Sequence, residues 1–213
     1  MTEPMTAART EREALCDLFD QMGPDAATLC SPWRTRDLAA HLVLRERRPD
    51  LAAGLFVPAL SPRLERAQRE LADTDWAALV STVRSGPPFW HPARLSAVDG
   101  AINTMEFVIH HEDVLRGDGE PRARREVPGF VADATWAALG QMARMFLRKV
   151  EAAVDLKTPG RKTIRAGRGP AVTVSGEPVD IALYLYGRKR AADVSITGDE
   201  RGVLGLERAK LGI

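Results

Sequence analysis

The sequence predicts a mainly α-helical protein, in which a four-helix bundle is followed by a small α/β domain. Apolar residues recur at the three- and four-residue spacing of an amphipathic helix over residues 6–22, 36–48, 99–116 and 129–154. From residue 162 onward the spacing shortens to two, which is typical of strands. We therefore expect a bundle domain over residues 1–156 and an α/β domain over residues 157–213.

Local signals set the expected ends of the helices. Gly23-Pro24 ends the first helix and Gly117-Asp118-Gly119 ends the third. Thr35 is the expected N-cap of the second helix, and Pro49 perturbs or ends it. Between the second and third long helices we expect two short ones, Arg63 to Leu71 and Asp75 to Val83.

The C-terminal part predicts strands joined by turns. The segments 163–166 and 171–175 flank a Gly-rich turn and are interpreted as a hairpin. Pro178 at a first helical position begins a helix that ends at Gly187. A third strand over 192–196 and a helix over 200–211 complete this domain, with a linker over 156–160 before it.

Composition excludes several classes of protein. The chain has 213 residues, 45% of them apolar and 28% charged, and its net charge is +1. A balanced charge does not indicate a nucleic-acid or membrane surface. Neither a signal peptide nor a membrane-spanning run is expected. Because Cys16 and Cys30 are in no metal-binding spacing, we expect a reduced cytoplasmic protein.

The stretch from Glu106 to Asp113 contains most of the candidate functional side chains. Glu106 and His110 are four residues apart, so they lie one turn apart on the same helix face, and Asp113 follows on that face. Ile109 shares this face, which is therefore expected to point inward. Buried polar groups of this kind must be paired, hydrogen-bonded or bound to an ion.

His41 lies on the apolar face of the second helix with Leu38 and Leu42. Together, His41, Glu106 and His110 are the three-ligand set of a catalytic zinc or similar divalent site, with Asp113 hydrogen-bonded to a ligand histidine. The alternative is a Glu106–His110 ion pair beside an unrelated core histidine. His91 lies within an aromatic, proline-rich stretch over 85–92 that either lines a pocket or caps the bundle.

Two motifs resemble a known family. The segment Ser31 to Leu42 resembles the first metal motif of the DinB-like superfamily, and more closely the N-terminal domain of mycothiol-dependent maleylpyruvate isomerase. The segment Glu106 to Val114 is similar to the second motif of that family, and the segment 172–188 is similar to its small α/β domain. Across its length the chain looks closest to an actinobacterial subfamily of metal-binding proteins.

The resemblance implies a divalent cation, zinc or else nickel, bound by His41, Glu106 and His110. It also implies mycothiol as a thiol cofactor and Arg188 as a functional arginine that binds a carboxylate of substrate or cofactor. Solvent exposure beside Lys189 and Arg190 is the alternative for Arg188. His111 and Glu112 replace the small residue and the aromatic that are usual in the family, so the substrate is expected to differ.

Two functions remain open at this point. The first is a thiol-dependent metalloenzyme with isomerase or S-transferase chemistry on a small electrophile. The second is a metal-binding protein without catalysis, for sensing or partner binding. An open ligand position favours the first, and a fourth protein ligand such as His91 or Asp113 favours the second. In either case the expected partners are small molecules, and the chain is expected to be a monomer or homodimer.

Overall fold

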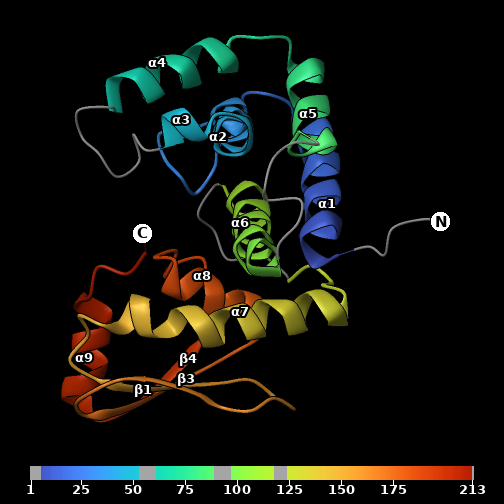
Figure 1. Cartoon of the computed structure of the whole chain (residues 1–213). Helices are drawn as coiled ribbons and strands as arrows, with labels where there is room; N and C mark the ends of the chain where they lie inside the picture. Colours follow the sequence, from blue (N-terminus) through green and yellow to red (C-terminus); the bar gives the residue numbers. More distant parts are fainter. Residues whose placement is uncertain (1–5, 53–60, 89–96, 118–123, 213) are drawn as a thin grey trace. The chain divides into compact units, whose positions relative to one another are not determined.

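A computed structural model describes residues 6–52, 61–88, 97–117 and 124–212 (Figure 1). The chain divides into two compact units. The first unit comprises Met1–Asn103 and His110–Asp118, and the second comprises Thr104–Ile109 and Gly119–Ile213. Helix α6 (Ala97–Leu115) contributes to both. The predicted division at residues 156 and 157 stays a prediction.

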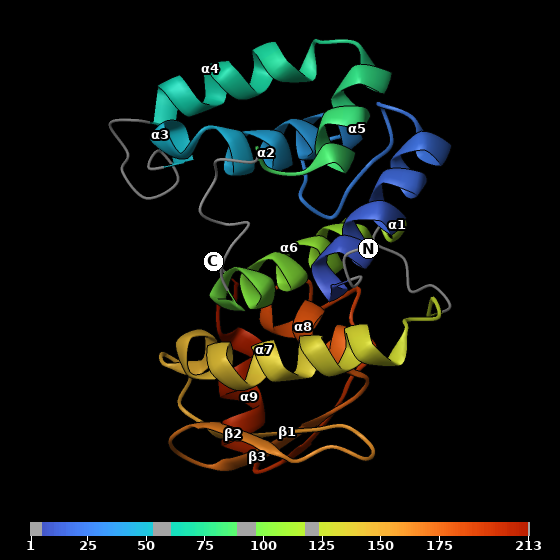
Figure 2. The same ribbon diagram turned by 45° about the vertical axis from the view of Figure 1, so that its right-hand side comes forward.

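The first unit is helical. Besides most of α6 it contains α1 (Ala7–Met22), α2 (Thr35–Arg47), α3 (Pro49–Ala52), α4 (Ser61–Ala72) and α5 (Trp76–Ser85). Helix α5 packs against α1, and α2 packs against both α4 and α5 (Figure 2). Helices α1, α2 and α5 turn apolar residues to this core, which includes Leu15, Phe19, Leu38, Leu42, Leu79 and Val83.

A buried ion pair connects three helices of this unit. Both Nη atoms of Arg12 on α1 bond to the carboxylate of Glu46 on α2, and Nη1 also donates to the carbonyl of Val83 on α5 at 2.9 Å. The Arg12 and Glu46 side chains are only 10% and 5% exposed. A pair this deeply buried is stable only while both partners remain.

Most predicted helix ends are confirmed, but the role of Thr35 is corrected. Thr6 caps α1 by accepting a hydrogen bond from the backbone N–H of Arg9. Helix α2 already includes Thr35, and Arg34 precedes it as the N-cap residue. The Thr35 hydroxyl donates instead to the carbonyl of Gly23, and so ties the start of α2 to the end of α1. Asp37 lies in the first turn of α2, where a negative charge favourably interacts with the helix dipole.

The second unit combines helices with a four-stranded sheet. Its helices are α7 (Gly129–Leu147), α8 (Pro178–Leu185) and α9 (Glu200–Arg208). Its strands β1 (Ala153–Lys157), β2 (Ile164–Gly167), β3 (Ala171–Ser175) and β4 (Ser195–Gly198) have the order β2-β1-β3-β4. Helix α7 packs against α8 and β2, and α9 packs against β3 and β4.

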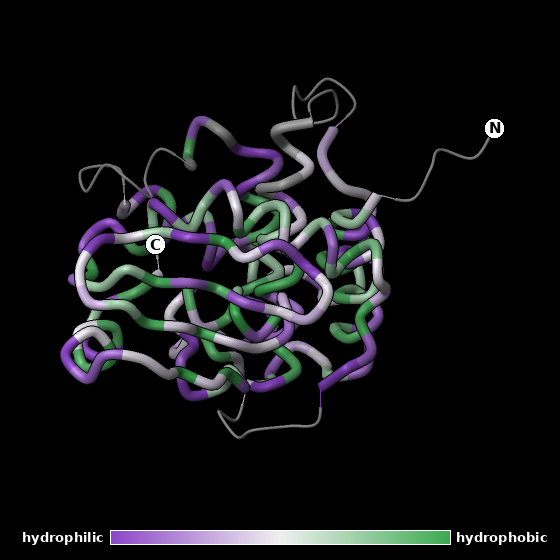
Figure 3. The backbone as a smooth tube through the Cα atoms, turned by 90° about the horizontal axis from the view of Figure 1, so that it is seen from below, coloured by the Kyte–Doolittle hydropathy of each residue, from purple (hydrophilic) through white to green (hydrophobic). Residues whose placement is uncertain are grey.

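Strand β1 corrects two predictions. The last long helix ends at Leu147, so residues expected at its end and in the linker form a strand instead. In that strand Val154 and Leu156 are buried and alternate with more exposed residues. Figure 3 shows the whole backbone coloured by the hydropathy of its residues. Because β1 lies between β2 and β3, these two strands do not form the predicted hairpin. β1 pairs antiparallel with β2 and parallel with β3.

Other boundaries differ by a few residues. The strand expected over 192–196 is Ser195–Gly198, and the last helix ends at Arg208. Helix α8 starts at Pro178 and has Tyr186 as its C-cap, as predicted. The segment that contains His91 lies outside the described residues. Across the described part of the chain, every helix is too short or too polar to cross a membrane.

Candidate metal centre

The residues predicted to bind metal lie on two helices. His41 lies on α2, and Glu106 and His110 lie one turn apart on α6. One ligand atom from each of these three residues lies within 4.8 Å of the other two. The imidazole rings of His41 and His110 have centroids 5.5 Å apart and are inclined at 74°. The structure thus brings the imidazole of His41 together with a carboxylate and an imidazole that lie 65 and 69 positions later in the sequence.

Neighbouring contacts hold the two histidine-bearing helices in place. Arg45, one turn after His41, donates from Nη1 to Oδ1 of Asn103 on α6 at 2.7 Å. The Trp33 ring packs against the His41 ring at a centroid distance of 5.2 Å. The His41 ring therefore contacts the rings of both Trp33 and His110.

Asp113 holds the second nitrogen of His110. Its Oδ2 lies 2.9 Å from Nδ1 of His110, and the Asp113 side chain is fully buried. A carboxylate at this position favours the tautomer with a proton on Nδ1, in which the lone pair that can bind an ion is on Nε2. The predicted role of Asp113 has this geometric support.

Cys30 is a member of the cluster that the sequence did not reveal. Its thiol donates to Oδ2 of Asp113 at 3.0 Å, the same oxygen that faces His110. One ligand atom each of Cys30, His110 and Asp113 also lie within 4.8 Å of one another. Since Cys30 and Asp113 are 83 residues apart, no short motif connects them.

The loop before α2 positions Cys30. The Thr28 hydroxyl donates to the carbonyl of Trp33 at 2.8 Å and accepts from the N–H of Cys30 at 3.2 Å. The N–H of Leu29 donates to the backbone carbonyl of Asp113 at 2.9 Å. These bonds attach the loop to the end of α6, so the thiol is held against the Asp113 carboxylate.

The unusual His111 and Glu112 are both buried and contact other residues. Nδ1 of His111 lies 3.5 Å from Oε2 of Glu11 on α1. Glu112 accepts a hydrogen bond from Nε of Arg116 at 2.6 Å, one turn later on α6. Both side chains therefore face acidic or basic neighbours in the first unit, which accounts for their presence on a buried helix.

Arg188 lies in the second unit, directly after α8. It is half-buried, and its Nη1 donates to the carbonyl of Tyr186 at 2.7 Å. The adjacent Lys189 has a structural role, because its Nζ donates to carbonyls at the end of α9, those of Leu206, Glu207 and Ala209. Burial lowers the pKa of Lys189. Arg188 is thus less exposed than the alternative interpretation expected.

The two cysteines differ in environment, which predicts a difference in reactivity. Cys16 is fully buried, and burial raises the pKa of its thiol from 9.0 to about 12. Cys30 is partly accessible. Because the thiolate is the reactive form, we expect Ellman's reagent to modify one thiol per chain in the native protein at pH 8 and two in urea. The Cys30→Ser variant should show no native reaction; rapid labelling of Cys16 in that variant would contradict this description.

Comparison with known proteins identifies the fold. No protein-family model matches the chain, and no curated protein matches it either. Among solved structures, the crystal structure of the mycothiol-dependent maleylpyruvate isomerase is similar, with a TM-score of 0.60, 14% identity and 91% of each chain covered. The chain has the DinB-like fold. The crystal structure of a histidine-to-alanine mutant of that enzyme has a TM-score of 0.59 at the same identity and coverage.

The DinB-like fold agrees with the predicted fold class, a helical domain followed by a small α/β part. At 14% identity the similarity concerns the fold alone. Activity, cofactor and site residues therefore have to be argued from the side chains of this chain.

Proposed function

We propose that the chain binds a divalent cation, zinc in the first instance, through His41, Glu106 and His110, and uses it in a mycothiol-dependent reaction on a small electrophile. The observation that supports this most is the convergence of three ligand atoms within 4.8 Å. The similarity to mycothiol-dependent enzymes supports the choice of thiol. The proposed reaction is that of an isomerase or an S-transferase and takes place in the cytoplasm.

The donor set fits the proposed ion. Two imidazoles and one carboxylate are ligands that zinc prefers, and three protein ligands leave a position for an exogenous group. When bound, such an ion lowers the pKa of a coordinated thiol or water and so supplies a nucleophile at neutral pH. The protein contributes orientation: Asp113 holds the proton of His110 on Nδ1, and Trp33 restrains the ring of His41.

The Asp113→Asn substitution should weaken zinc binding about 10- to 100-fold. An amide keeps the shape of the side chain but removes the negative charge that makes His110 a stronger ligand. Competition with a chromophoric chelator measures this affinity. The control is Asp133→Asn on α7, where the carboxylate is 70% exposed and pairs with Arg161. Equal affinities of the Asp113→Asn variant and the wild type would contradict the proposed contact.

Arg188 is proposed to bind a carboxylate of the substrate or the thiol cofactor. A guanidinium forms two parallel hydrogen bonds with a carboxylate, which fixes its orientation. Half-burial of Arg188 and its bond to the Tyr186 carbonyl restrict the side chain before any ligand binds. This role is specific to arginine, because lysine offers a point charge instead of a planar fork.

A non-catalytic metal-binding or sensing protein is the second candidate. It is favoured by one observation, the group formed by Cys30, His110 and Asp113, which places further ligand atoms beside the first set. A cation with an additional thiolate or carboxylate ligand would have no open position. The two candidates thus differ in whether a small molecule reaches the ion.

A turnover assay separates the two candidates. The zinc-loaded protein is incubated with mycothiol and a panel of electrophiles that starts with maleylpyruvate. We expect turnover that requires both thiol and metal, is lost in Glu106→Gln, and shows a higher KM in Arg188→Lys. Stoichiometric zinc without thiol-dependent turnover on any electrophile would favour the non-catalytic protein.

A further inference from the structure

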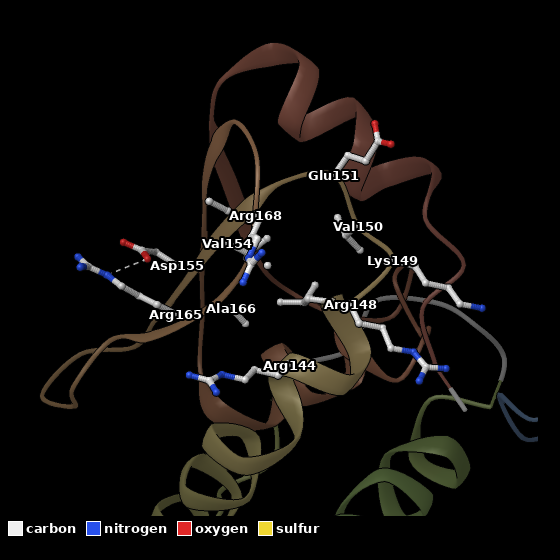
Figure 4. A pocket seen from close by; sticks show the side chains of 13 residues that line it. Arg144, Arg148, Lys149, Val150, Glu151, Val154, Asp155, Arg165, Ala166 and Arg168 are labelled. Carbon is white, nitrogen blue, oxygen red and sulfur yellow. Dashed lines mark ion pairs between the residues drawn. The ribbon is translucent and has the colours of Figure 1, made fainter.

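A basic hollow in the second unit is separate from the residues of the proposed metal centre. It has a volume of about 910 Å³ and is lined by the end of α7, the segment that follows it, and strands β1 and β2 (Figure 4). Five lining side chains are basic and two are acidic. The basic ones are Arg144, Arg148, Lys149, Arg165 and Arg168, and the acidic ones are Glu151 and Asp155.

Most of this positive charge has no acidic partner. Asp155 pairs with Arg165 at 3.1 Å, as the dashed line in Figure 4 marks. Among the described residues, the other four basic side chains form no ion pair, and all four are exposed. Like charges that share one hollow repel one another unless an anion lies between them. The hollow therefore has an excess of positive charge that a bound anion would balance.

Helix geometry explains only part of this cluster. Arg144, Arg148 and Lys149 lie at or just after the end of α7, where cations favourably interact with the helix dipole. Arg165 and Arg168 come instead from β2 and the turn that follows it, and they serve no helix end. Two unrelated segments thus contribute cations to the same hollow, which a helix dipole alone does not account for.

The backbone on both sides of Arg168 packs closely against the segment before β1. Gly167 has a φ of +82°, and a Cβ there would lie 2.2 Å from the carbonyl oxygen of Ala152. Gly169 has a φ of +128°, and a Cβ there would lie 3.0 Å from the carbonyl of Glu151. Only glycine fits both positions without strain. The turn therefore lies directly on the segment before β1, and Arg168 is the side chain it presents between two glycines.

We propose that this hollow binds a small polyanion that carries phosphate or carboxylate groups. Its volume is within the range of about 300–1,000 Å³ that small-molecule sites occupy. Guanidinium groups form paired, charge-assisted hydrogen bonds with both kinds of oxyanion. The site lies in the second unit and shares no residue with the metal ligands, so it goes beyond the proposed function.

Isothermal titration calorimetry of the full chain tests this site, with fructose 1,6-bisphosphate as the phosphate probe and tricarballylate as the carboxylate probe. Both titrations are run at the same ionic strength. The test variant carries two substitutions, Arg148→Gln and Arg168→Gln. Both arginines are exposed, so the variant should keep the native fold. The control is Arg66→Gln on α4, an exposed arginine outside the hollow.

We expect saturable binding of at least one probe to the wild type and to Arg66→Gln. The double variant should bind that probe at least about tenfold more weakly. Binding of the bisphosphate alone assigns the site to phosphate groups, and binding of tricarballylate alone assigns it to carboxylates. Absence of saturable binding of either probe, or equal weakening in Arg66→Gln, would overturn the proposal. Metal content does not enter this test.

Discussion

Glu46→Ala is expected to lower the free energy of unfolding by about 3–5 kcal/mol. The substitution leaves the Arg12 guanidinium buried among α1, α2 and α5 without its carboxylate, although its bond to the Val83 carbonyl remains. Removing one member of a buried pair is far costlier than the net contribution of the pair itself. Urea denaturation followed by circular dichroism measures the loss.

The matched control is Arg84→Ala, which breaks a second connection between α5 and α1. Arg84 pairs with Asp17 and Asp20, both more than half exposed. Exposed pairs typically contribute at most about 1 kcal/mol. A loss of similar size in the two variants would mean that the Arg12–Glu46 pair does not behave as a buried one.

Gly117→Ala is the second substitution with a large expected effect, a loss of about 2–3 kcal/mol in unfolding free energy. A Cβ at Gly117 would lie 1.9 Å from the carbonyl oxygen of Ala27 and 3.0 Å from Cα of Thr28. These are backbone atoms, so the loop that carries Cys30 would have to move away from the end of α6. The substitution should therefore also weaken zinc binding.

Gly100→Ala on α6 is the control. A Cβ at Gly100 meets no atom of the described residues within 4 Å. Alanine favours a helix over glycine by up to about 1 kcal/mol, so this variant should be more stable than the wild type. The same substitution is thus expected to have opposite effects on stability within α6 and just after its end; destabilisation at both positions would contradict the close contact with Ala27.

The long helices could be predicted from the sequence because apolar spacing and helix-ending residues are local features. Helix α6 follows from the spacing of its apolar residues and from the glycine after it, and the same spacing placed Glu106 one turn before His110. That His41 converges with them was suggested by the ligand types on two inward helix faces and was favoured further by the resemblance, but the spacing alone left an unrelated core histidine as the alternative. The structure supplies the geometry of that convergence, while the bound metal stays a proposal.

The errors concern features that depend on distant segments. Strand β1 follows α7 after a short turn with no proline or glycine, so its first residues were taken as the end of the helix. These residues form a strand because they pair with both β2 and β3. Since β1 was not predicted, β2 and β3 were wrongly expected to pair with each other as a hairpin. Thr35 was predicted as the N-cap from its residue type at the start of a helix. Its actual hydrogen bond to the Gly23 carbonyl joins residues 12 positions apart, so local sequence could not reveal it.

The metal content of the purified chain tests the central proposal most directly. The protein is prepared without a metal-binding tag and analysed by mass spectrometry beside His41→Ala and His110→Ala, with circular dichroism to verify that all three are folded. The proposal predicts about one equivalent of zinc or nickel in the wild type and little in either variant. A folded wild type that takes up neither metal after reconstitution would contradict it and leave Glu106 and His110 as a polar pair on α6.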